Sequence, residues 1–138
     1  KLPIMSHPWT PSSHNPSQKL SYPPLFETYI ARYPDVTFIC AHSGGRYDGM
    51  MRAVDLARRY ANVYMDTAGD VYLNRYIEYL VRQVGSERLL FGSDGFWVDA
   101  RTQLGMIYEA DVSPADKENI LFRNARRVFR IETPEEAR

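Results

Sequence analysis

Short apolar runs alternate along the chain with longer segments in which apolar residues recur at helical spacing. Runs of the first kind predict strands, and they cover residues 2–6, 36–41, 62–68 and 88–93. Segments of the second kind predict helices, and they lie after Ser21 up to Pro34 and near 48–60, 71–84, 100–109 and 122–130. Ser113-Pro114-Ala115-Asp116 predicts the capped start of a further helix that runs toward Leu121. Because strands and helices alternate, the pattern predicts an α/β fold with a parallel sheet, built from about four βα units.

Three of the predicted strands run into a side chain that can bind a metal or transfer a proton. His7 follows the first strand, His42 the second and Asp94 the fourth, and each is followed by glycine, proline or polar residues. The carboxyl ends of parallel strands meet at one edge of a sheet, and in a (β/α) barrel this edge carries the active site. We therefore expect His7, His42 and Asp94 to belong to one site.

Each of these side chains has more than one interpretation. A neutral imidazole at a strand end is a common ligand for a divalent metal, and a histidine such as His42 can also act as a general base. His7 could instead be an ordinary surface or core histidine, and the His42 side chain could be satisfied by a backbone carbonyl. An unpaired carboxylate at the end of an apolar strand is unfavourable, so Asp94 is expected to coordinate a metal or to cap a helix, while Asp99 or Thr102 could cap the following helix instead.

Other residues near the same strand ends are candidates for binding a substrate. Arg46 follows the glycine turn after His42 and could pair with a substrate carboxylate, or it could be an ordinary surface arginine. The aromatic residues Trp9, Phe96 and Trp97 flank the proposed site and could form the wall of an aromatic pocket, or pack against loops. Asp66 at the end of the third strand could support an imidazole or make a structural hydrogen bond.

Alternation along the second strand adds an expectation about faces. If His42 points into the site, Phe38 and Cys40 should share its face, while Ile39 and Ala41 should face the helices.

Length and charge limit the classes of protein. The 138 residues suit one domain, but a complete barrel takes roughly 250. The chain starts at Lys1 and enters an apolar run at once, so residues 1–138 are expected to form part of a barrel. Basic and acidic residues number 17 each, which gives no case for nucleic acid or an anionic membrane surface. No apolar stretch approaches the ~20 residues that span a bilayer.

Cysteine content and missing motifs narrow the choice further. The single cysteine, Cys40, excludes an internal disulfide, and a cytoplasmic location is the default expectation. The sequence contains no G-x-S-x-G, no P-loop, no C-x-x-C and no dinucleotide-binding glycine motif. Ser43-Gly44-Gly45 after a strand could hold a phosphate at a helix N-terminus, so a phosphate-binding barrel remains a lesser alternative.

Taken in order, several segments resemble the amidohydrolase superfamily. The closer branch is amidohydrolase family 2, related to aminocarboxymuconate-semialdehyde decarboxylase. The matching stretches span nearly the whole chain: Met5-Ser6-His7-Pro8-Trp9, Arg32-Tyr33-Pro34-Asp35-Val36, Ala41-His42-Ser43-Gly44-Gly45, Asn62-Val63-Tyr64-Met65-Asp66-Thr67, Arg88-Leu89-Leu90-Phe91-Gly92-Ser93-Asp94 and Asn124-Ala125-Arg126-Arg127-Val128-Phe129.

The resemblance implies that the chain is the C-terminal half of a TIM-type (β/α)8 barrel, from strand five to strand eight. It also implies that His7 and Asp94 are ligands of a divalent metal, most commonly zinc, with manganese as the alternative. His42 would serve as an acid/base beside the metal, so His42 and Asp94 form the catalytic pair.

Two features depart from the family pattern. The family's His-x-His or Glu-x-His pair on strand one has no counterpart, and Gly95-Phe96 follows Asp94 where many relatives have an aromatic residue and then proline. Two protein ligands are fewer than the three or four of a tight zinc site, so the fragment alone should bind metal poorly and be inactive. Its open sheet edges predict self-association or pairing with a missing N-terminal half.

Two function hypotheses follow. The first is a metal-dependent decarboxylase or hydrolase that acts on a small carboxylated, lactone or aromatic substrate. The second is a non-catalytic α/β domain that associates with a partner chain through its sheet edges.

Overall fold

Four short parallel strands form the centre of the molecule. The computed structural model describes residues 1–12 and 14–132. Its sheet has the order β1-β2-β3-β4, so each strand pairs in parallel with the next one along the chain. The strands are β1 (Ile4–Ser6), β2 (Phe38–Cys40), β3 (Val63–Asp66) and β4 (Leu89–Leu90). The prediction of an α/β fold with a parallel sheet is confirmed.

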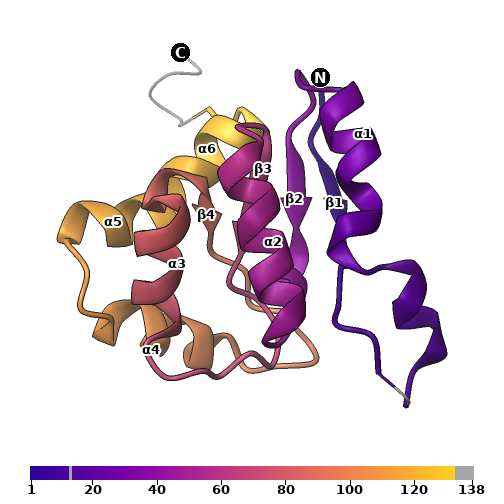
Figure 1. Ribbon diagram of the computed structural model, residues 1–138. Coiled ribbons are helices and arrows are strands. Elements are labelled where there is room, and N and C mark those ends of the chain that lie inside the picture. The colour runs from indigo at the N-terminus through magenta and orange to yellow at the C-terminus, as the bar shows by residue number, and fades with distance from the viewer. Residues whose placement is uncertain (13, 133–138) are drawn as a thin grey trace.

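Helices connect the strands and continue after the last one. The α-helices are α1 (Glu27–Arg32), α2 (Asp48–Arg59), α3 (Tyr76–Val84), α4 (Ala100–Glu109), α5 (Pro114–Glu118) and α6 (Asn124–Phe129). The 3-10 helices are η1 (Pro16–Leu20), η2 (Pro23–Phe26), η3 (Ala41–Gly44) and η4 (Ser86–Arg88), while η5 (Asn119–Arg123) is a π-helical turn between α5 and α6. Helices α1, α2 and α3 lie on the same side of the sheet (Figure 1).

The core lies between the sheet and these helices. Leu56 of α2 and Leu80 of α3 are almost fully buried, and they belong to the same apolar cluster as Val63, Met65 and Leu89 of the strands. Burying one such side chain contributes roughly 1.5–3 kcal/mol. This packing fixes the strands, and with them the loops that leave their carboxyl ends.

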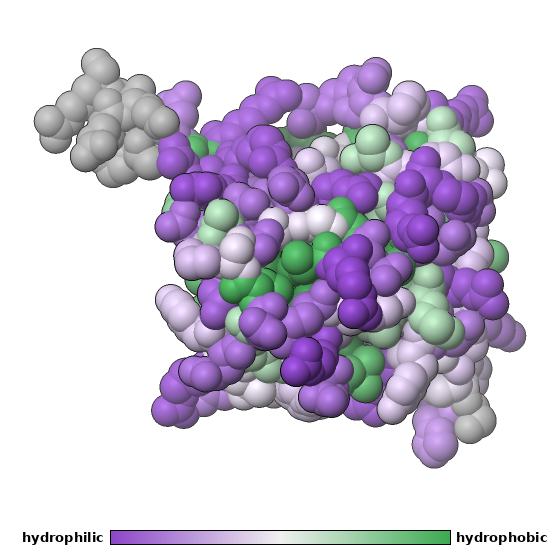
Figure 2. Space-filling view, turned by 60° about the vertical axis from the view of Figure 1, so that its left-hand side comes forward, coloured by the Kyte–Doolittle hydropathy of each residue, from purple (hydrophilic) through white to green (hydrophobic). Residues whose placement is uncertain are grey.

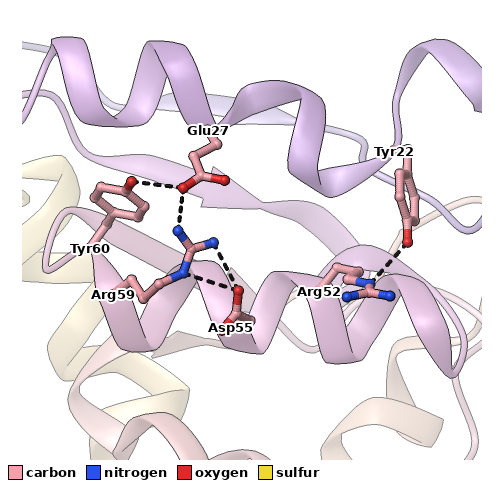
Figure 3. Close-up of polar contacts among 6 residues, drawn as sticks. All are labelled: Tyr22, Glu27, Arg52, Asp55, Arg59 and Tyr60. Carbon is pink, nitrogen blue, oxygen red and sulfur yellow. Dashed lines mark hydrogen bonds and ion pairs between the residues drawn. The ribbon is translucent and has the colours of Figure 1, made fainter.

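Polar contacts join α1 and the residue before η2, Tyr22, to α2 and its C-terminal end, as Figure 3 shows. The Glu27 carboxylate accepts hydrogen bonds from Arg59 and, at 2.8 Å, from the Tyr60 hydroxyl. Arg59 also donates to Asp55, and the Arg52 Nε donates to the Tyr22 hydroxyl at 3.1 Å. The pKa of Glu27 is lowered, first by the bond from Arg59 and then by that from Tyr60. Because these groups are at least partly exposed to solvent, each contact contributes little to stability.

Several predicted boundaries differ from the structure. Each strand is shorter than its apolar run, because only a few residues of each run pair with a neighbouring strand. The helix predicted after Ser21 is divided into η2 and α1, and Tyr22 precedes η2 without a side-chain cap. The helix predicted at 71–84 starts only at Tyr76, because Arg75 has left-handed backbone angles (φ 54°, ψ 35°) that cannot continue a helix.

The predicted faces of the second strand are wrong. Phe38 packs against Phe26 of η2, with ring centroids 5.4 Å apart, and Cys40 lies with it in the core shared with α2. These two residues therefore face the helices. His42 is aimed by the η3 turn, where the alternation of a strand no longer applies.

None of the helices within the described residues is both long and apolar enough to cross a membrane. On the face in Figure 2 hydrophilic residues predominate, and apolar surface gathers toward the centre.

Candidate functional site

One cavity lies at the carboxyl ends of the strands. His7 follows β1 directly, His42 lies in η3 after β2, and Asp94 lies in the loop after β4. All three line a cavity of about 360 Å³. The imidazole rings of His7 and His42 are edge to face, with centroids 4.7 Å apart. The structure thus brings together three side chains that are distant in sequence.

The walls of this cavity are aromatic and polar. Its other lining residues are Trp9, Gln18, Arg46, Gly69, Asp70 and Trp97. Trp9 stacks on His7 with centroids 5.5 Å apart and meets the His42 ring edge to face at 5.6 Å. Gly45 permits this close packing, because a Cβ there would lie 2.8 Å from the Trp9 ring. The volume is within the roughly 300–1,000 Å³ of small-molecule sites.

Two of the predicted substrate-binding residues occupy unexpected positions. The side chain of Phe96 is fully exposed and does not line the cavity. Arg46 lines it, but its guanidinium forms an ion pair with the Asp70 carboxylate. A substrate carboxylate at this rim would therefore compete with Asp70 for Arg46.

Asp94 does not cap the following helix. Its backbone carbonyl accepts hydrogen bonds from the Trp97 and Val98 amides, each at 3.1 Å. The N-cap of α4 is Asp99, whose carboxylate accepts from the Arg101 amide at 2.9 Å. The prediction that Asp94 caps a helix is therefore wrong, and Asp94 lines the cavity instead.

The backbone at His42 is in a conformation that is rare for residues with a side chain. His42 has φ 53° and ψ 26°, and Ser43 has φ 49° and ψ 31°. Left-handed angles cost roughly 1–2 kcal/mol per such residue. Asp66 offsets this strain: its Oδ1 accepts from the His42 amide at 2.8 Å and from the Ala68 amide at 3.0 Å. The Ser43 hydroxyl donates to the Asp66 carbonyl at 2.7 Å.

Burial governs the electrostatics next to the cavity. Burial raises the pKa of Asp66, while hydrogen bonds from the His42 and Ala68 amides oppose that rise. Burial likewise raises the pKa of the Cys40 thiol to about 12, and this thiol is free. A thiol held protonated in this way is a core residue and a poor nucleophile.

The cavity offers side chains of the types that bind divalent metals, but fewer of them than a metal site usually needs. Imidazole and carboxylate groups are ordinary ligands for such ions, and a protein site usually supplies three or four. Within residues 1–12 and 14–132, however, no three histidine, cysteine, aspartate or glutamate side chains are gathered closely enough to hold an ion. His7 and Asp94 could supply part of a ligand set.

Sequence reasoning missed some residues of the cavity. Gly69 and Asp70 follow the third strand, so the rule that selected His7, His42 and Asp94 could have found them. Gln18 lies in η1, inside a segment without any apolar period, and no local pattern indicates it.

A parallel sheet with a lined cavity at the carboxyl ends of its strands is the architecture of (β/α) barrel enzymes. The family model for amidohydrolases, Amidohydro_2, matches residues 1–131, and the chain belongs to this family. No curated protein sequence matches the chain.

Solved structures of similar fold are barrel proteins and decarboxylases. An uncharacterised TIM-barrel protein from Bordetella bronchiseptica has a TM-score of 0.72 at 19% identity, over 91% of this chain and 45% of its own. Amidohydrolase 2 from Bifidobacterium longum subsp. infantis has a TM-score of 0.67 at 20% identity, over 95% and 50%. A dihydroxybenzoic acid decarboxylase from Polaromonas, with bound manganese and the inhibitor 2-nitroresorcinol, has a TM-score of 0.66 at 18% identity, over 97% and 51%. At these identities the similarity concerns the fold, and the chain spans about half the length of these structures.

Proposed function

We propose that this chain is the C-terminal half of a metal-dependent amidohydrolase-family barrel, in which β1 to β4 correspond to strands five to eight. The complete protein would be a decarboxylase or hydrolase acting on a small carboxylated, lactone or aromatic substrate. The observation that carries the proposal is the convergence of His7, His42 and Asp94 on one cavity at the carboxyl ends of the strands.

His7 and Asp94 would hold a divalent ion, zinc or manganese, together with ligands from outside this chain. When bound, such an ion acts as a Lewis acid and can lower the pKa of a water molecule to about 7. His42 lies beside His7 and would move the proton. In a hydrolase it would accept the proton of the attacking water, and in a decarboxylase it would donate one to the carbon that loses carbon dioxide.

The other cavity residues suit a flat, anionic substrate. Trp9 and Trp97 offer aromatic surface, and Arg46 offers a guanidinium to a carboxylate in exchange for Asp70. The similar Polaromonas structure is a decarboxylase of dihydroxybenzoic acid that binds manganese. Hydroxylated benzoates are therefore the first substrates to test, with aromatic lactones as the hydrolase alternative.

The test is turnover by the full-length protein loaded with zinc or manganese. Carbon dioxide release from a hydroxybenzoate would support the decarboxylase, and ring opening of a lactone would support the hydrolase. The His42→Ala variant should keep its metal and lose about 100-fold or more in turnover. Wild-type turnover in that variant would remove His42 from the mechanism.

Metal content tests the ligands separately. Near-stoichiometric metal in the full-length protein should fall sharply in His7→Ala and in Asp94→Ala, while His14→Ala, outside the cavity, should keep it. Unchanged metal in both ligand variants would reject the assignment. Absence of metal and of turnover in the wild type would favour the non-catalytic domain that binds a partner through its sheet edges.

A further inference from the structure

We propose that Asp66 and Gly69 are positioning residues that fix His42, one through its backbone and the other through its ring. The importance of this for turnover rests on the proposed function, in which His42 moves the proton. The positioning itself rests only on contacts in the structure.

Asp66 holds the backbone of His42. Without the hydrogen bond from the His42 amide to Oδ1 at 2.8 Å, the left-handed angles of His42 and Ser43 would lack a compensating contact on this side. Asp66 and Ser43 are both buried, and the Ser43 hydroxyl donates a hydrogen bond to the backbone carbonyl of Asp66. Since strained backbone persists only where its surroundings impose it, this pair of bonds determines the direction in which His42 leaves the strand.

Gly69 sets the position of the imidazole ring. A Cβ at Gly69 would overlap the Nδ1 atom of His42 and lie 2.9 Å from its Cγ, so only glycine leaves room for the ring. The backbone of Gly69 is itself held, because the buried Gln103 amide donates to its carbonyl. The rings of His7 and Trp9 also contact the ring of His42. Its orientation is thus fixed before any substrate arrives.

A matched pair of glycine variants tests the ring contact. Gly69 and Gly85 both have a positive φ, 84° and 80°, so an alanine is strained at each position. At Gly85 the new methyl would meet only the Glu87 Oε2 atom, the end of a flexible side chain, at 2.8 Å. We expect Gly69→Ala to lower kcat about 100-fold with little change in KM, since misplacement of a reacting group has effects of this size. Gly85→Ala should lose stability but keep kcat.

Two substitutions at Asp66 test the backbone contact. Asp66→Ala removes the acceptor of the His42 amide, whereas Asp66→Asn retains an oxygen that can accept the same bond. We expect kcat to fall in Asp66→Ala and to be largely restored in Asp66→Asn. Equal losses in the two glycine variants, or wild-type kcat in both Gly69→Ala and Asp66→Ala, would overturn the proposal.

A readout without turnover separates this proposal from the proposed function. In the full-length protein labelled with ¹⁵N-histidine, the His42 signal is the one that disappears in His42→Ala. It should shift in Gly69→Ala and Asp66→Ala and remain in place in Gly85→Ala. If the wild type turns over no substrate but these shifts occur, the positioning holds and the proposed function fails. If the His42 signal does not shift in Gly69→Ala or in Asp66→Ala, the positioning is refuted. If Asp66→Ala fails to fold, an unshifted His42 signal in Gly69→Ala is enough to refute it.

Discussion

At the scale of single residues, one buried side-chain amide joins helix α6 to strand β4. Asn124 is fully buried at the start of α6. Its Nδ2 donates to the carbonyls of Ser86 and Leu89, each at 2.7 Å, and its Oδ1 accepts from Arg127 at 3.0 Å. Because Leu89 begins β4, this side chain helps to fix the segment that leads to Asp94.

We expect Asn124→Ala to lower the free energy of unfolding by about 2–3 kcal/mol, since two buried carbonyls would lose their partner. Urea unfolding followed by circular dichroism measures the difference. Asn74→Ala, at an exposed position, is the control and should change stability by less than about 0.5 kcal/mol. An unaltered urea midpoint in Asn124→Ala would show that water satisfies these carbonyls.

Single residues of the site differ in how far the sequence predicts them. His7, His42 and Asp94 were accessible because a polar side chain directly after an apolar strand is visible in the sequence. The role of Asp66 was only partly accessible, because it accepts from the backbone amide of His42 and not from the imidazole. That bond depends on left-handed angles at a residue other than glycine, which no local pattern reveals.

At the scale of elements, α5 begins with a reciprocal pair of hydrogen bonds. The Ser113 hydroxyl accepts from the Asp116 amide at 3.1 Å, and the Asp116 carboxylate accepts from the Ser113 amide at 3.1 Å. The Ser113 hydroxyl also donates to that carboxylate, and this bond is the main reason that the pKa of Asp116 is lowered. These bonds satisfy amides that the first helical turn leaves unpaired.

We expect Ser113→Ala to destabilise the protein by about 1 kcal/mol, while Ser113→Thr retains the cap. The pKa of Asp116 is lower in the folded protein than in the unfolded chain. The stabilisation by its charged carboxylate, hydrogen-bonded to Ser113, is therefore present at neutral pH and is lost as the pH falls through the folded pKa. Thermal unfolding of the three proteins at pH 7 and pH 3 should therefore show a smaller difference in acid. A difference that grows in acid would contradict this account.

Elements with such local signals were the most predictable. Helix α4 spans Ala100–Glu109, as the apolar period indicated, because the Asp99 cap stands in the sequence. Helix α3 starts later than predicted because Arg75 turns the chain, and the turn-forming residue Asn74 is a weak local signal of that turn. The strands are short because pairing in the sheet, which is a tertiary property, decides their length.

At the scale of the whole molecule, the sheet ends in two unpaired edges within the described residues. Strand β1 lies at one edge, and its residues Ile4 and Met5 are 53% and 57% exposed. An edge that combines free backbone groups with exposed apolar side chains promotes association. In the complete barrel that we propose, a preceding strand would cover it.

For residues 1–138 produced alone, we expect association that increases with concentration in sedimentation velocity. Ile4→Lys should weaken it, because a charge on an edge strand opposes strand pairing. Leu20→Lys, at a 73% exposed position in η1, is the matched control and should leave the association unchanged. If the chain is monomeric at all concentrations, or if both variants act alike, β1 is not the interface. If instead a separately produced N-terminal half restores a single folded species with Ile4 protected from solvent, the edge is the junction between two halves of one barrel.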